Sequence, residues 1–146
     1  MADGGSYVLG IDVPRGLAIE VGALGELTFP AGTYAYVGSA FGPGGFARVD
    51  RHRELARGDR TARHWHVDYL LCTPSTRLAS ALTFPGEDRE CALAGALPGE
   101  PVAGFGASDC ACESHLLALP AGTTLAEAVA AVGVRGGTDV VGEDGG

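Results

Sequence analysis

The residues from 32 to 52 combine side chains that could act together on a phosphate group. This stretch reads GTYAYVGSAFGPGGFARVDRH. A strand is predicted over residues 33–38, and Tyr34 and Tyr36 would lie on one face of it because side chains alternate along a strand. The glycine-rich residues that follow predict a loop without regular structure. Gly38, at the start of this loop, would let backbone approach a site there because it has no Cβ atom.

A helix is predicted over residues 46–57, and it carries basic groups. Arg48 and His52 are four residues apart, so they are neighbours on one helical face. The pattern predicts that this face also includes Arg51 and Leu55, and that the apolar stripe consists of Phe46, Val49, Arg53 and Ala56. Two phenols at a strand end and an Arg/His pair on the next helix could all converge on a phosphate.

The distribution of charge supports a phosphate-facing surface. The net charge is −8, and all ten basic residues are arginine, which is typical of proteins from a salt-rich cytoplasm. Residues 46–66 carry six arginines against three acids, a net of +3, while the remainder carries four arginines against fifteen acids, a net of −11. A basic segment on an acidic body suits a nucleic-acid site. A solvated helix face with ion pairs explains the same composition equally well.

These motifs resemble the core of the GIY-YIG nuclease superfamily. Tyr36-Val37-Gly38 corresponds to the YIG half of its signature, and Gly5-Ser6-Tyr7 fits the first half. Arg48 corresponds to the catalytic arginine of the family, with His52 at the RxxxH spacing. The chain is also similar to a small branch that combines YVGSA, RxxRH, HWHxDYLL and GFGxSDCxCxSHL, sometimes attached to endonuclease III-type repair enzymes. The resemblance covers roughly residues 5 to 120.

The resemblance implies a metal-dependent endonuclease that hydrolyses nucleic-acid phosphodiester bonds, in DNA repair or processing. The implied catalytic residues are Tyr7, Tyr36, Gly38, Arg48, His52 and Glu90. Glu90 would hold Mg²⁺ or Mn²⁺, which acts as a Lewis acid on the phosphate. Tyr7 would take a proton from the attacking water or position that water, with help from Tyr36. Arg48 would stabilise the charge on phosphate, and His52 would donate to a phosphate or leaving oxygen.

The expected partner is DNA, with RNA left open, and a repair glycosylase is a further possible partner. The predicted nucleic-acid-binding residues are Arg51, Arg57, Arg63, His64 and His66. A non-catalytic nucleic-acid-binding module on the same scaffold is the first alternative, because the chain contains no asparagine where many family members have a late one. A zinc-binding protein is the second alternative.

Two patterns favour the zinc alternative. His64 to Leu71 alternates clearly enough to predict a strand with His64, His66 and Asp68 on one face, where they could ligate a metal or merely pack against the basic helix. Cys110, Cys112 and His115 are close enough in sequence to chelate zinc, although a tight turn before an apolar strand is the favoured interpretation. Neither pattern is needed by the nuclease hypothesis, so structural zinc belongs to the alternative of a zinc-binding protein.

The chain as a whole predicts an α+β fold with a small antiparallel sheet flanked by helices. A chain of 146 residues suggests one domain, here over residues 5–132, followed by an acidic, glycine-rich tail over 133–146 that we expect to be disordered. The gap between Tyr7 and Tyr36 is longer than is usual in the resembled family, which implies an extra strand pair, and strands with a bend at residues 30–32 are predicted there. A helix is predicted from residue 85, with acids in its first turn and Glu90 among them, and a capping box at Thr124 and Glu127 predicts a final helix. No apolar run is long enough to span a bilayer and no signal sequence is visible, which predicts a cytoplasmic protein.

Overall fold

The computed structural model describes most of the predicted domain. The described residues are 5–39, 47–58, 66–73, 75–85, 96–102, 115–120, 122–131 and 138–139. Among them, no helix has both the length and the apolar character needed to cross a membrane. The predicted helix that begins after residue 85, with Glu90 in its first turn, lies outside these residues.

The fold is a mixed α+β arrangement, as the sequence predicts. Six strands form one antiparallel sheet in the order β6-β7-β4-β1-β5-β8. The strands of this sheet are β1 (Gly5–Val13), β4 (Gly32–Ser39), β5 (Arg77–Pro85), β6 (Glu100–Pro101), β7 (Leu116–Ala118) and β8 (Thr138–Asp139). The helices are α1 (Ala47–Arg57), α2 (His66–Leu71) and α4 (Leu125–Ala131).

The predicted extra strand pair extends the central hairpin. Strands β2 (Leu17–Glu20) and β3 (Glu26–Phe29) form a separate two-stranded sheet, joined by a short 3-10 helix at Gly22–Leu24. The last pair of β1 with β4 is Val13 with Gly32, and the first pair of the small sheet is Leu17 with Phe29. Between these two pairs, the first arm of the hairpin has three residues (14–16) and the second has two (30–31). This inequality matches the bend expected at residues 30–32. Tyr7 and Tyr36 lie on β1 and β4, the two directly paired strands that this bend extends.

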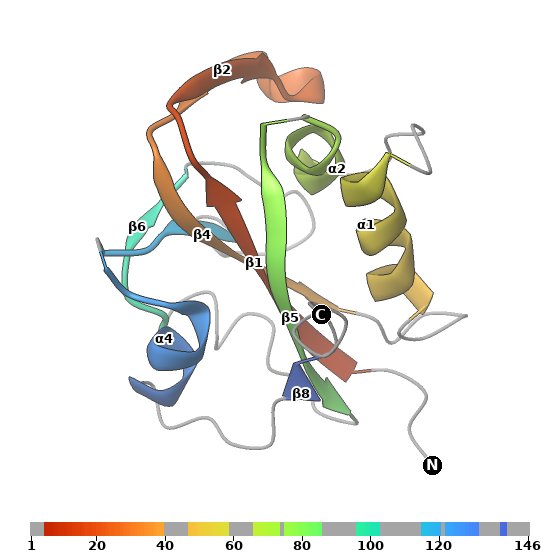
Figure 1. Ribbon diagram of the computed structural model, residues 1–146, viewed down its shortest axis with the longest axis vertical. Helices are drawn as coiled ribbons and strands as arrows, with labels where there is room; N and C mark the ends of the chain where they lie inside the picture. The colour runs from red at the N-terminus through yellow and green to blue at the C-terminus, as the bar shows by residue number, and fades with distance from the viewer. Residues whose placement is uncertain are drawn as a thin grey trace.

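Both faces of the central strand pair are buried. Side chains alternate along β1, so that Tyr7 and Leu9 enter one hydrophobic cluster and Val8 enters another. On β4, Tyr34 and Tyr36 share the first cluster, as predicted. Helices α1 and α2 cover this first face, and α4 lies across the sheet from them on the second face (Figure 1). The side chains of Tyr7 and Tyr36 thus point toward α1, the helix that carries His52.

The extent of α1 agrees with the prediction, but its buried face does not. The buried side chains of this helix are Val49, His52 and Leu55. They are spaced by three residues, so they form one stripe against the sheet. His52 therefore belongs to the core side of the helix, with only 1% of its surface exposed. The prediction that grouped His52 with the polar face was wrong, because an imidazole with buried hydrogen-bond partners packs as well as an apolar group.

The predicted strand over residues 64–71 was also wrong. Residues from His66 onward form helix α2, in which Val67, Leu70 and Leu71 are all buried. Their spacing fits a helical face as well as the alternation fits a strand, and a short run does not distinguish the two. The argument for a metal site rested on one strand face, and it no longer holds for His66 and Asp68, which lie two residues apart on a helix; His64 lies outside the described residues.

The C-terminal region contains the predicted capped helix. Thr124 Oγ1 accepts a hydrogen bond from the Glu127 backbone N–H at 3.2 Å, and the Glu127 carboxylate accepts one from the Thr124 N–H at 3.0 Å. This is a reciprocal capping box at the start of α4. In the predicted tail, Thr138 and Asp139 pair with β5 as the short strand β8. The other residues of the tail lie outside the described part of the chain.

Candidate functional site

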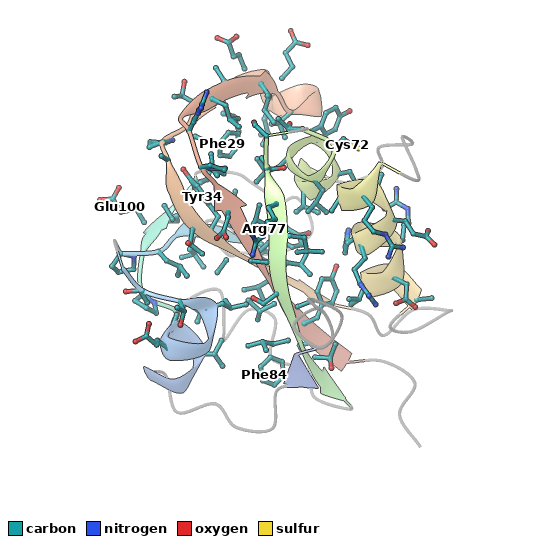
Figure 2. All side chains as sticks on the ribbon, in the orientation of Figure 1. Phe29, Tyr34, Cys72, Arg77, Phe84 and Glu100 are labelled. Atoms are coloured by element: carbon teal, nitrogen blue, oxygen red, sulfur yellow. The ribbon has the colours of Figure 1, made fainter. Side chains whose placement is uncertain are left out.

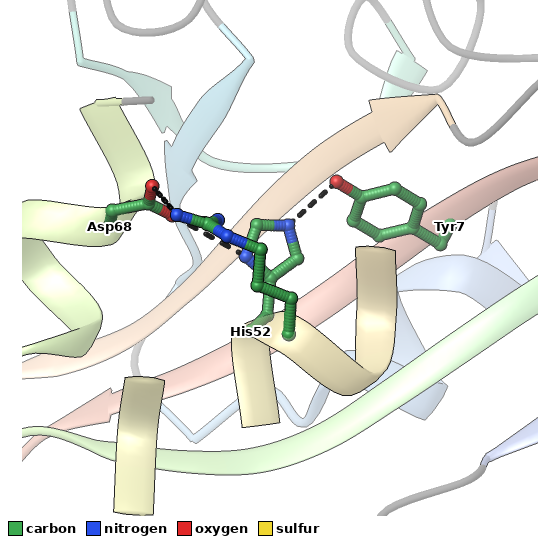
Figure 3. A network of polar contacts seen from close by, with 4 residues as sticks. Tyr7, His52 and Asp68 are labelled. Carbon is green, nitrogen blue, oxygen red and sulfur yellow. Dashed lines mark hydrogen bonds and ion pairs between the residues drawn. The ribbon is translucent and has the colours of Figure 1, made fainter. Parts of the chain in front are cut away.

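Two tyrosines and a histidine meet on the first face of the sheet. The Tyr7 hydroxyl oxygen lies 2.9 Å from His52 Nε2, within hydrogen-bond distance (Figure 3). The ring of Tyr36 lies edge-on to His52, with ring centroids 6.4 Å apart, and 6.5 Å from the ring of Tyr7. These three residues come from β1, β4 and α1, so only the packing of the helix on the sheet brings them together.

Gly38 makes room for the ring of Tyr7. The two residues are directly opposite each other on β4 and β1. A Cβ atom added at Gly38 would lie 2.5 Å from the Tyr7 hydroxyl oxygen and 2.8 Å from its Cε2 atom, distances that no real side chain adopts. The sequence predicted that Gly38 allows close approach to the site. The structure shows that the approaching group is the side chain of Tyr7 itself.

A buried carboxylate lies on the far side of His52. Asp68, on α2, is completely buried, and its Oδ1 atom is 3.6 Å from His52 Nδ1. The guanidinium of Arg51 donates to both carboxylate oxygens, at 3.3 and 3.0 Å. This two-pronged pairing offsets the cost of burying the charge of Asp68. The polar network therefore runs from Arg51 through Asp68 and His52 to Tyr7 (Figure 3).

The network has a direction that its chemistry determines. A neutral imidazole carries one N–H and one acceptor nitrogen. When Nε2 accepts the hydrogen bond of the Tyr7 hydroxyl, the ring proton is on Nδ1, the atom that faces Asp68. Tyr7 can then release its proton to His52 while Asp68 stabilises the imidazolium that forms. The same logic operates in serine-type triads, with a phenol in place of the serine hydroxyl.

Tyr34 plays a different part from the other two phenols. Its hydroxyl donates to the backbone carbonyl of Pro30 at 2.7 Å, and its ring packs edge-on against Phe29. Burial raises the pKa of Tyr34 above the ordinary value of a phenol. This hydrogen bond ties Tyr34 to the bend of the hairpin. Figure 2 labels Tyr34 and Phe29, which lie on the side of the molecule away from α1.

The remaining predicted site residues are only partly described. Arg48 lies on α1 one turn before His52, and its side chain is outside the description. Arg57 is exposed at the end of the same helix, whereas the Arg51 side chain is 15% exposed and engaged by Asp68. His66 begins α2, and its side chain is likewise not described. Glu90, Arg63 and His64 lie outside the described residues.

The role of Asp68 is the part of the site that sequence reasoning missed. Asp68 was placed on a strand face with two histidines, but its partners are Arg51 and His52. The RxxRH motif did contain a signal. Arg51 and His52 are adjacent on a helix, and an arginine next to a buried histidine needs a carboxylate nearby to balance its charge. Which carboxylate serves is decided by the docking of α2 on α1.

The chain was compared with known proteins by family, by sequence and by structure. Residues 6–136 match the family described as Domain of unknown function DUF123. The chain belongs to this DUF123 family. Searches of curated proteins and of solved structures found no match. The DUF123 match includes Tyr7, Tyr36, His52 and Asp68, so the whole network lies within the family domain.

The described residues do not assemble a metal site. No group of three or more His, Cys, Asp or Glu side chains among them is close enough to hold an ion. His115 is described and buried, whereas Cys110 and Cys112 lie outside the described residues, as does the predicted magnesium ligand Glu90. The predictions of a divalent ion at Glu90 and of structural zinc therefore stay predictions.

Two grooves lie at the opposite end of the central strands. They have volumes of about 630 and about 420 Å³ and share the segments 31–33 and 119–120. The larger one is also lined by Asp12 and Arg77, and Asp12 accepts a hydrogen bond from Thr33 at 3.1 Å. None of the residues of the Tyr7 network lines either groove. They are separate features from the candidate site.

Proposed function

We propose that this DUF123 protein is a metal-dependent nuclease of the GIY-YIG type, which hydrolyses phosphodiester bonds in DNA. The observation that carries the proposal is the buried hydrogen bond between Tyr7 and His52, with Tyr36 against both rings. The resemblance named these three residues as catalytic from motifs far apart in the sequence. Their convergence at one place is the geometry that a shared catalytic role requires.

In this proposal, Tyr7, His52 and Arg48 would activate the attacking water and stabilise the phosphate. A phenol is a weak base at its reference pKa of about 10, so Tyr7 needs a partner to accept its proton. His52 Nε2 is in position to do so at 2.9 Å. As Tyr7 gives its proton to His52, its oxygen takes a proton from the attacking water. Arg48, one helical turn from His52, would stabilise the charge that builds on the phosphate.

The proposal includes a divalent metal ion, Mg²⁺ or Mn²⁺, with Glu90 as its protein ligand. Such an ion would polarise the phosphate and lower the pKa of bound water. The basic residues Arg57 and Arg63 and the histidines His64 and His66 are the proposed contacts to the nucleic acid. Repair or processing of DNA, in the cytoplasm and alongside a repair glycosylase, is the proposed context.

A binding module without catalysis is the second candidate. It is favoured by the 1% exposure of both Tyr7 and His52, which leaves little of either side chain open to a substrate, and by the absence of asparagine from the chain. In this case the network would be structural. It would hold α1 on the sheet and so present the exposed Arg57 to a phosphate backbone.

The deciding experiment is a cleavage assay on labelled branched and duplex DNA, in high salt, with and without magnesium or manganese. The variants are Arg48→Ala and Glu90→Ala. Arg77→Ala is the control for Arg48→Ala, because it removes the same positive charge at an exposed position at the start of β5. Metal-dependent cleavage that is lost in the first two variants and kept in the control supports the nuclease.

Each alternative has its own outcome in the same assay. DNA binding without cleavage, weakened by Arg48→Ala and not by Arg77→Ala, would support the binding module. Wild-type protein that neither cleaves nor binds DNA would contradict both. Metal analysis of the purified protein separates the zinc alternative, which requires one zinc ion per chain.

A further inference from the structure

The carboxylate of Asp68 occupies the side of His52 that lies opposite Tyr7. Four groups surround the imidazole. Three of them, Tyr7 on β1, Tyr36 on β4 and Asp68 on α2, come from other elements, and the fourth is Arg51, the partner of Asp68, on α1 itself. Among these groups, the Tyr7 hydroxyl faces the ring nitrogen Nε2, and the Asp68 carboxylate faces the other ring nitrogen, Nδ1. The ring is thus placed between a proton donor and a negative charge.

This placement selects one tautomer of the neutral ring. A carboxylate favours an N–H on the nitrogen that faces it, as the buried aspartate of serine-type triads does. Here that nitrogen is Nδ1, so Nε2 is left as the acceptor that Tyr7 needs. The Nδ1–Oδ1 distance of 3.6 Å is longer than a hydrogen bond, so the influence is electrostatic.

Arg51 explains why the carboxylate stays at this distance. Its guanidinium donates hydrogen bonds to both carboxylate oxygens of Asp68, and one of these oxygens, Oδ1, also faces His52. Because Arg51 and His52 are neighbours on α1, the pair fixes Asp68 relative to the same helix that carries the imidazole. A carboxylate held in this way cannot rotate away from the ring without losing a two-pronged ion pair.

We propose that Asp68 is a positioning residue of the candidate site, which holds His52 in the Nδ1–H tautomer and so allows Nε2 to take the proton of Tyr7. Arg51 is the residue that holds Asp68 in place. In the step itself, the Tyr7 O–H bond breaks as the Nε2–H bond forms, and the phenol oxygen takes one proton of the attacking water. The hydroxyl of that water bonds to phosphorus as the bond between phosphorus and the leaving oxygen breaks. The leaving oxygen takes up a proton from solvent, and His52 loses the proton on Nε2 to solvent.

The catalytic part of this inference rests on the proposed nuclease function, but the tautomer does not. Nitrogen-15 NMR of the His52 ring measures the tautomer directly in the full-length protein, whether or not the protein cleaves DNA. The test variant is Asp68→Asn, which keeps the shape and removes the charge. Asp50→Asn is the matched control, because Asp50 pairs with Arg53 on the exposed side of α1 at the same distance of 3.6 Å.

We expect the wild-type ring to carry its neutral proton on Nδ1, and Asp68→Asn to give a mixture of tautomers. In the cleavage assay, kcat should fall about 10- to 100-fold with KM within about twofold, by analogy with carboxylates that orient a metal-ligating histidine. Asp50→Asn should change none of these quantities.

Loss of the buried charge of Asp68 leaves Arg51 without its main partner, so the single variant can lose its fold. The double variant Arg51→Gln with Asp68→Asn removes both charges and restores the balance. A wild-type tautomer in a folded Asp68→Asn or double variant, or kcat within twofold of wild type, would overturn the role of Asp68. Absence of cleavage by the wild type, together with a tautomer that depends on Asp68, would overturn the nuclease and keep the positioning role.

Discussion

The two faces of the β1–β4 strand pair are equally buried and differ in what they bury. The first face, under α1 and α2, holds three phenols and borders the buried polar side chains of His52 and Asp68. The cluster on the second face, beside α4, consists of aliphatic side chains and Phe84, which Figure 2 labels near the far end of β5. Within the described residues, the buried titratable side chains Tyr7, His52 and Asp68 contact their partners on the first face.

The difference teaches how a small domain can separate stability from chemistry. Burying polar groups is costly unless they find partners, and the first face offsets much of that cost with hydrogen bonds and ion pairs among four side chains. The second face needs no such network, and its packing contributes hydrophobic stabilisation directly. Substitutions on the two faces should therefore affect different measurements.

Removal of one hydroxyl from the first face should give the largest effect on activity. Tyr7→Phe deletes the group that donates to His52, so we expect cleavage to fall about 10²- to 10⁴-fold, the usual contribution of a positioned acid or base. The unfolding free energy should fall by only about 1 kcal/mol. Tyr34→Phe is the matched control, because it removes the same atom from the same face at a hydroxyl bonded to Pro30. Equal losses of cleavage in the two variants would contradict the special role of Tyr7.

Truncation on the second face should have the opposite result. Phe84 is fully buried, so Phe84→Ala should lower the unfolding free energy by about 3–5 kcal/mol through lost burial and a cavity. The cleavage rate per folded molecule should stay within about twofold of wild type. Denaturant unfolding and cleavage at low temperature measure the two quantities. A large loss of rate in fully folded Phe84→Ala would mean that the two faces are coupled.

A methyl group added to each face sharpens the same comparison. Gly38→Ala forces the Tyr7 ring to move, so we expect a loss of about 1–3 kcal/mol in stability together with a loss of cleavage. Gly10→Ala, on the neighbouring strand, places its methyl against Ser80 and Leu125 on the side of α4. It should reduce stability without reducing the cleavage rate of folded molecules. Loss of cleavage in Gly10→Ala as great as in Gly38→Ala would break the distinction.

The smallest expected effect is a pH dependence from Tyr34. Because burial raises the pKa of this phenol in the folded state, the unfolded chain loses the phenolic proton at a lower pH than the folded one does. The stabilisation is present below the reference pKa of about 10 and decreases as the pH rises above it. Tyr34→Phe should make the unfolding free energy less steep against pH in this range. An unchanged slope would show that Tyr34 does not carry the effect.

The sequence by itself determined the elements with strong local signals. The alternation at residues 33–38 fixed which face carries Tyr34 and Tyr36, and the capping box at Thr124 fixed the start of α4. The spacing between Tyr7 and Tyr36 required an added strand pair, which the structure shows as an extension of the central hairpin. These features depend on neighbours in sequence, so propensity and period were enough to predict them.

Only the tertiary structure decided where the polar groups of the site point. The run from His64 to Leu71 fits two periods, and packing against α1 selected the helix, which carries Asp68 to Arg51 and His52. His52 is polar by type, yet the sheet beneath α1 supplies Tyr7 as its partner and makes it a buried residue. A partner that is 45 residues away in the chain leaves no local signal, because its contribution to the free energy exists only after the elements have docked.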